Sequence, residues 1–176
     1  MNKHIVILLF LCLFLSIQAS AQSTDVSSQI PTQLLEEEIL SETNQAIIDQ
    51  EGNKNNVSIV QRQAGLEANL AAVLQSGRFN EAILQQQGSQ NQTTLYQNGL
   101  NNSYELNLIG EGNSIEVVQI GNENSVLQNL DGIRNLEIEI LQEGNENEII
   151  QELNGNSNMG LQIIQSGNGL KATIRQ

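Results

Sequence analysis

A short repeat that returns through most of the chain constrains its fold more than any other feature. Its form is Q-x-G-x-x-N-x-φ-x-φ-x-Q, where φ is an apolar residue, and one complete copy consists of Gln75, Gly77, Asn80, Ala82, Leu84 and Gln86. The glycines are 11 residues apart between Gly77 and Gly132 and 11 to 13 residues apart elsewhere. They are Gly52, Gly65, Gly77, Gly88, Gly99, Gly110, Gly121, Gly132, Gly144, Gly155 and Gly167. Because low complexity alone would enrich Gln and Asn without fixing their spacing, we interpret the chain as a series of equal structural units.

Each unit has the pattern of one strand and one turn. The Asn, the two apolar residues and the closing Gln are spaced by two, which places their side chains on one face of a strand. The apolar residues do not recur at intervals of three and four, so the pattern does not favour a helix. All the glycines above except Gly65 are predicted turn residues, because glycine admits the positive φ that tight turns require.

The repeat predicts an all-β fold, a β-solenoid. Two consecutive units, together about 22 residues, make one coil, and successive coils stack about 4.8 Å apart. Residues 44–176 supply about twelve strands and therefore about six coils. The turn after Gln61 is expected to be longer by about three residues, and the inward set is expected to shift by one residue after Asn135, as in a β-bulge.

Stacking gives the repeated amides a structural role. A lone buried amide costs about 1–3 kcal/mol, whereas identical amides one above another can hydrogen-bond in a ladder along the stack. The alternative is that these side chains lie on a polar surface. The glutamines predicted to form the assembly ladder are Gln50, Gln61, Gln75, Gln86, Gln97, Gln119, Gln142, Gln165 and Gln176. The asparagines are Asn55, Asn80, Asn91, Asn102, Asn113 and Asn124.

The N-terminal residues are typical of an export signal. Lys3 and His4 precede an apolar run over residues 5–17, and the small residues 19–21 provide a cleavage site, which predicts a signal peptide at 1–21. A membrane anchor is the alternative, although the run is shorter than the roughly 18 residues that span a bilayer. Cleavage would remove Cys12 and His4, the only Cys and His of the chain. We therefore expect no disulfide, no metal site, no cofactor and no enzymatic activity.

Residues 22–43 lack the repeat and form a leader of their own. Residues 31–40 in this leader have the composition of one short helix, and a disordered tail is the other interpretation.

The charge of the chain is strongly negative. It has 20 acidic and 7 basic residues, with a net charge of −13, which argues against binding nucleic acid or anionic membranes. Glu116 and Glu137 are predicted to take the same outward position in strands two units apart, where like charges destabilise the stack. Assembly is therefore expected to be faster at about pH 4–5 or at high salt. A calcium site is the rival interpretation of such paired carboxylates, although no D-x-D motif supports it.

The repeat that begins at Gln75, and the start of another at Gln50, Gly52 and Asn55, resemble the curlin repeat of Gram-negative bacteria. The resemblance extends over about residues 44–176. It implies a subunit of curli, the secreted amyloid fibres on the cell surface that serve adhesion and the biofilm matrix. It also implies export through an outer-membrane secretion pore and assembly on a nucleator, with no nucleic acid or small-molecule substrate. By its position, the leader could be the export-targeting segment of such a subunit.

The subunit type stays open on this resemblance. Residues 43–52 are similar to the start of the repeats of the minor, nucleating subunit. The basic final repeat of that subunit is absent, and so is the Gly-rich leader of the major subunit.

Self-association is the function that the pattern itself favours. The last unit, with Ala172, Ile174 and Gln176, has no capping helix behind it, and an open solenoid end can template another copy head to tail. A secreted β-solenoid adhesin that does not polymerise is the main alternative. An ice-binding solenoid would show a regular Thr-x-Thr face, of which only Thr93 and Thr94 are present, and a glycosidase would need two carboxylates in a cleft.

Overall fold

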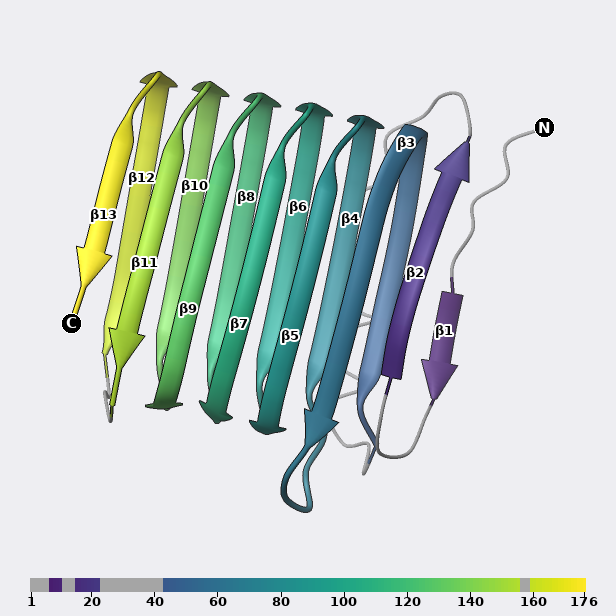
Figure 1. Cartoon of the computed structure of the whole chain (residues 1–176), viewed down its shortest axis with the longest axis vertical. Helices are drawn as coiled ribbons and strands as arrows, with labels where there is room; N and C mark the ends of the chain where they lie inside the picture. Colours follow the sequence, from purple (N-terminus) through teal and green to yellow (C-terminus); the bar gives the residue numbers. More distant parts are fainter. Residues whose placement is uncertain (1–6, 11–14, 23–42, 156–158) are drawn as a thin grey trace.

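The computed structural model describes residues 7–10, 15–22, 43–155 and 159–176 (Figure 1). The short helix predicted at 31–40 lies outside these ranges, as does most of the leader. The described residues form strands joined by turns and bends. Within those ranges there is consequently no helix long and apolar enough to cross a membrane.

Thirteen strands make up the described structure. They are β1 (Ile7–Phe10), β2 (Leu15–Gln22), β3 (Gln45–Gln63), β4 (Leu70–Arg78), β5 (Glu81–Ser89), β6 (Gln92–Leu100), β7 (Ser103–Glu111), β8 (Ser114–Asn122), β9 (Ser125–Arg134), β10 (Glu137–Asn145), β11 (Glu148–Asn154), β12 (Gly160–Asn168) and β13 (Lys171–Arg175).

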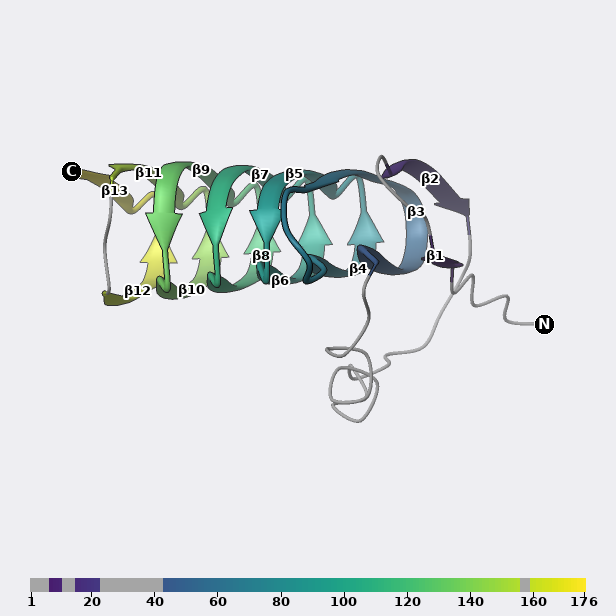
Figure 2. The same cartoon turned by 90° about the horizontal axis from the view of Figure 1, so that it is seen from below.

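The strands from β3 onward wind into a two-layered β-solenoid (Figure 2). The even-numbered strands form one layer and the odd-numbered strands the other. β3 is 19 residues long and belongs to both layers, because its first half pairs with β4 and its second half with β5. All these pairings are parallel, and β3 supplies two rungs while β4 to β13 supply one each. The predicted fold of about twelve strands in about six coils is confirmed.

The core lies between the two layers and follows the alternation of the repeat. In β8, for example, Ile115, Val117 and Gln119 are buried while Ser114 and Glu116 are exposed. The buried apolar residues form one continuous cluster along the stack. Burying each of the larger aliphatic side chains contributes about 1.5–3 kcal/mol, and long-range parallel pairing holds them in register.

Two predicted irregularities of the repeat are confirmed. The longer turn after Gln61 places Asn69 on Asn44, where the Asn69 N–H donates to the Asn44 Oδ1 at 2.9 Å. The predicted one-residue shift is present as well, and its extra residue is Gly132, since Ile109 pairs with Asp131 and Gly110 with Ile133. Leu136 consequently lies beside Asn113, and the Leu136 N–H donates to the Asn113 Oδ1 at 3.0 Å. These adjustments change the local coil length while every inward side chain keeps its face.

The two N-terminal strands pair differently from the rest. β1 lies antiparallel to β3 over residues 45–48, and β2 lies antiparallel to β3 over residues 53–61. Both lie on the side of β3 that faces away from the stack, at the N-terminal end of the solenoid (Figure 1). They belong to the segment that the sequence predicts to be a signal peptide.

Candidate functional site

A continuous glutamine ladder lies inside the even-numbered layer. Each Nε2 donates to the Oε1 of the glutamine in the next coil, at 2.7 to 2.9 Å. Its members, in order, are Gln50, Gln75, Gln97, Gln119, Gln142 and Gln165. Gln97 Nε2 also donates to the Glu81 carbonyl of the opposite layer at 3.0 Å, and the others except Gln50 make the equivalent bond. All the amides of this ladder therefore point in the same direction along the stack.

The glutamines of the odd-numbered layer form a shorter ladder that changes position. Gln61 Nε2 donates to Gln86 Oε1 at 2.8 Å, and Gln86 Nε2 donates to the Thr93 hydroxyl at 2.6 Å. Leu108 occupies the next place, so the ladder stops there and returns only at Gln176, which is exposed on the last rung. The repeat pattern predicts Gln86 and Gln176 as ladder members. Gln86 bonds to Gln61 but lies opposite Leu108 in the following coil, and Gln176 lies on the last rung, where its N–H donates to the Glu152 carbonyl.

The sequence pattern missed a second pair of buried glutamines in this layer. Gln128 lies two residues before Leu130, which occupies the ladder position of this strand. Its Oε1 accepts a hydrogen bond from the Tyr104 hydroxyl at 2.7 Å, and its Nε2 donates to Gln151 Oε1 at 2.7 Å. Burial raises the pKa of Tyr104 well above its usual value, which keeps the hydroxyl as a donor. Among the described residues, Gln151 Nε2 has no hydrogen-bond partner, because Ile174 lies opposite it. The signal for this pair was Leu130 and Leu153 in the positions where the repeat expects glutamine.

The asparagines form two further ladders, one at the start of each layer's strands. Asn80 is typical: its Oδ1 accepts the Asn102 N–H and the Asn102 Nδ2, both at 3.1 Å. Its Nδ2 donates to the Ser76 carbonyl at 3.0 Å and to the Gly99 carbonyl of the next coil at 3.1 Å. The buried asparagines at this position are Asn44, Asn55, Asn69, Asn80, Asn91, Asn102, Asn113, Asn124 and Asn147. In the odd-numbered layer, Asn55, Asn80, Asn102, Asn124 and Asn147 close their own turns in this way. In both layers the asparagines join neighbouring coils.

Nine of the ten predicted turn glycines have a positive φ, as the repeat predicts, with values between 68° and 141°. The turns also have left-handed corners, with φ between 52° and 59° at Lys54, Phe79, Gln90, Asn101, Glu123, Asn135 and Glu146. These corners lie two residues after the repeat glycine, except that Asn135 lies three residues after Gly132. Gly110 is not among the positive-φ residues. The repeat glycine is also needed because coils approach closely there: a Cβ at Gly99 would lie 1.9 Å from the Gly121 carbonyl oxygen. Gly52, Gly77, Gly99, Gly121, Gly144 and Gly167 form this column in register.

Replacing a left-handed corner residue by glycine should stabilise the solenoid. Glu123 has φ of 58° and an exposed side chain, so Glu123→Gly removes backbone strain without removing a buried contact. We expect a gain of about 1 kcal/mol, measured as a higher urea midpoint. Glu123→Ala removes the same charge but keeps the strained φ, so it should not reproduce the gain. An equal gain in both variants would assign the effect to charge.

Two glutamates lie opposite each other in neighbouring strands, as predicted, but the predicted partner of Glu116 is wrong. Glu116 lies opposite Glu139 in the neighbouring strand, whereas Glu137 lies opposite Ser114. Leu136 takes the register position of Asn113 and Ile138 that of Ile115, so the residue opposite Glu116 is Glu139. Gln162 Nε2 donates to Glu139 Oε2 at 2.7 Å on the far side of the pair. Repulsion between the Glu116 and Glu139 carboxylates therefore opposes coil stacking at this point.

Glu116→Gln should relieve that repulsion. We expect a gain of about 0.2–1 kcal/mol in the free energy of unfolding that decreases at high salt. Glu137→Gln is the matched control, because its neighbours are Ser114 and Gly160. The urea midpoints of both variants at low and high salt measure the difference. A control that gains as much as Glu116→Gln would show that total charge, rather than this pair, is responsible.

The solenoid presents two different ends. We call the free sides of β12 and β13 the C-terminal edge and the side of β3 that faces β1 and β2 the N-terminal edge. In the described part of the chain, β12 and β13 have one neighbouring strand each. On the C-terminal edge Leu161, Ile163, Ala172 and Ile174 are only partly buried against the core. The last rung also has exposed ion pairs, Lys171 with Glu148 and Arg175 with Glu152, and the hydrogen bond and charge of Glu148 raise the pKa of Lys171.

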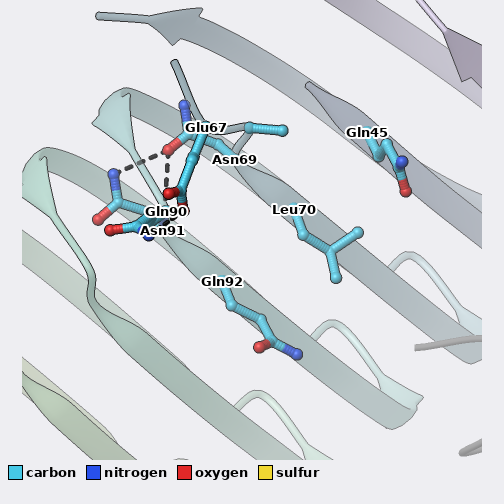
Figure 3. A pocket seen from close by; sticks show the side chains of 8 residues that line it. Gln45, Glu67, Asn69, Leu70, Gln90, Asn91 and Gln92 are labelled. Carbon is cyan, nitrogen blue, oxygen red and sulfur yellow. Dashed lines mark hydrogen bonds between the residues drawn. The ribbon is translucent and has the colours of Figure 1, made fainter. Parts of the chain in front are cut away.

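A small recess of about 130 Å³ lies beside the asparagine ladder, at the long turn that follows β3 (Figure 3). Gln45, Glu67, Asn69 and Gln90 are among the residues that line it, and Gln90 Nε2 donates to the Glu67 carboxylate. Glu67 is the single carboxylate among its lining residues. Across the described residues, no group of three or more His, Cys, Asp or Glu side chains could hold a metal ion.

A scan against protein-family models, a search of curated proteins and a search of solved structures each found no match to this chain.

Proposed function

We propose that the chain is a secreted structural subunit that stacks end to end into an extracellular amyloid-type fibre of the curli kind, used for adhesion and as biofilm matrix. The observation that supports this most is the parallel, in-register stack of coils with amide ladders, which has an open edge at β12 and β13. Unpaired strand edges of this kind recruit further strands. The outer-membrane secretion pore and a second curli subunit are the partners that this function requires.

The two ends match when the coil repeat is continued into a second copy. The even layer would bring Leu161, Ile163 and Gln165 opposite the second copy's Ala46, Ile48 and Gln50. The odd layer would bring Ala172, Ile174 and Gln176 opposite its Val57, Ile59 and Gln61. Aliphatic residues thus meet aliphatic residues and amides meet amides, and the partly buried side chains of the C-terminal edge become core.

The direction of the ladders selects head-to-tail stacking. Each Nε2 of the ladders donates toward higher residue numbers, so Gln165 presents a donor at one end while Gln50 and Gln61 present acceptors at the other. Among the described residues, the buried Gln61 Oε1 has no partner, and the Gln176 amide of a second copy would supply one. Two copies stacked end to end in opposite directions would instead place donors against donors.

Fibre growth by purified exported chain tests the proposal. We expect fibres that bind amyloid dyes, give a reflection at about 4.7 Å along the fibre axis and seed their own growth. Protein that stays monomeric at concentrations where curli-type subunits polymerise would contradict the proposal and favour the adhesin. Seeding of a second curli subunit at low molar ratio would assign the nucleating role to this chain, whereas growth only on the seeds of another subunit would assign the bulk role.

A further inference from the structure

The N-terminal edge is occupied by the chain itself. β1 pairs with residues 45–48 of β3, and β2 pairs with residues 53–61. These are the backbone positions onto which a second copy's β12 and β13 would add in head-to-tail stacking. The opposite end of the solenoid has no such covering strands in the described part of the chain.

The covering strands close this edge without continuing the solenoid. They run antiparallel to β3, whereas every other pairing in the stack is parallel. Their register also shifts between Ala21 and Gln22. An antiparallel strand satisfies the edge N–H and C=O groups but cannot continue the parallel register from which the amide ladders are built. Gln61 pairs with Leu15 across this edge, and its Oε1 lacks a partner there.

We propose that residues 7–22 are an intramolecular cap that competes with a second copy of the chain for the N-terminal edge. This inference rests on the proposed function. β2 ends at Gln22, directly after the predicted cleavage site, so cleavage after Ala21 would remove both strands except for one residue. The cleavage that accompanies export therefore also opens the edge for assembly, and the full chain stays unpolymerised inside the cell.

The cap makes the two ends of the full chain unequal. Its C-terminal edge is open and can add to the N-terminal edge of a growing fibre. Once added, it presents a capped edge to the next copy. The full chain should therefore act as a terminator of growth at one fibre end, below stoichiometric amounts, while the other end continues to grow.

The experiment compares full chain purified without export and chain recovered after export, with both N-termini determined by mass spectrometry. We expect the full chain alone to form no fibres and, when added to growing fibres of exported chain, to stop elongation at one of the two ends in time-resolved fluorescence microscopy. The Gly167→Ala full chain is the matched control. Its C-terminal edge carries a methyl group directed at the N-terminal edge of the fibre, so this chain should not add to the fibre and should not terminate growth.

Two results would overturn the cap: fibre growth by the full chain at the rate of the exported chain, or no effect of the full chain on either end. Hydrogen exchange provides a readout that does not require fibres. The amides of residues 45–48 and 53–61 should be protected in the full chain and less protected in exported monomer, and equal exchange in both would also reject the cap. Failure of the exported chain to form any fibre would instead reject the proposed function.

Discussion

Gly99→Ala is expected to prevent the coils from stacking around residues 99–121. The new Cβ would lie 1.9 Å from the Gly121 carbonyl oxygen, and Gly99 has φ of +131°, which a side chain rarely adopts. The clash is with backbone, which no rotamer change can relieve, so the two coils must separate and lose ladder bonds on both sides. We expect a loss of at least about 4 kcal/mol in the free energy of unfolding, measured by urea denaturation.

Gly160→Ala is the matched control for this prediction. Gly160 lies in β12, has no positive φ, and a Cβ there would meet nothing within 4 Å. The same substitution should change the free energy of unfolding by less than about 0.5 kcal/mol. Similar losses in the two variants would show that the glycine column is not needed for close approach of the coils.

Gly167→Ala is expected to abolish fibre growth while the single chain stays folded. Within its own chain, a Cβ at Gly167 would meet only Leu170 side-chain atoms, at 3.5 and 3.9 Å. Continuing the repeat, however, places it against the carbonyl of a second copy's Gly52, as a Cβ on Gly144 would lie 1.9 Å from the Gly167 carbonyl. The monomer should lose about 1–3 kcal/mol from strain at its φ of +141°, while each head-to-tail junction is blocked.

Gly169→Ala separates backbone strain from the blocked junction. Gly169 has φ of +65° in the same turn and nothing within 4 Å of an added Cβ. Equivalent corners of other coils already hold side chains, at Glu123 and Glu146. This variant should be strained less than Gly167→Ala, because side chains already adopt this region at other corners, and it should elongate seeds at about the wild-type rate, as followed by dye fluorescence. Normal elongation of Gly167→Ala would reject head-to-tail stacking in the register described.

The repeat was sufficient to predict the architecture because alternation by two and a constant period leave little freedom. A strand that presents Ile115, Val117 and Gln119 on one face must bury that face, and a coil of about 22 residues stacks identical positions on each other. The in-register amides from Gln50 to Gln165 follow directly from that stacking. Even the irregular coils could be located, since a displaced Asn or aliphatic residue shows the inserted residue in the sequence.

The finer features depend on backbone geometry that a residue pattern does not contain. The repeat could not show that glycine is required by a carbonyl in the next coil, or that the left-handed corner falls on residues such as Phe79 and Glu123. Glu116 lies opposite Glu139 and not Glu137 because Leu136 takes the register position of Asn113, which sets every outward pair between β8 and β10. Tyr104 and Gln128 meet only because the odd layer exchanges its glutamine and leucine positions between coils.

By itself, the sequence determined that this chain forms stacked β-coils with buried amides, since periodic burial is a local property repeated along the chain. Only the tertiary structure decided what lies at each end of the stack. The partnerless Gln61 oxygen, the open sides of β12 and β13, and the antiparallel strands on β3 arise from contacts between segments far apart in sequence or from contacts that are missing at a boundary. A repeat that is the same in every coil contains no information about its own boundaries, which is where the proposed assembly would take place.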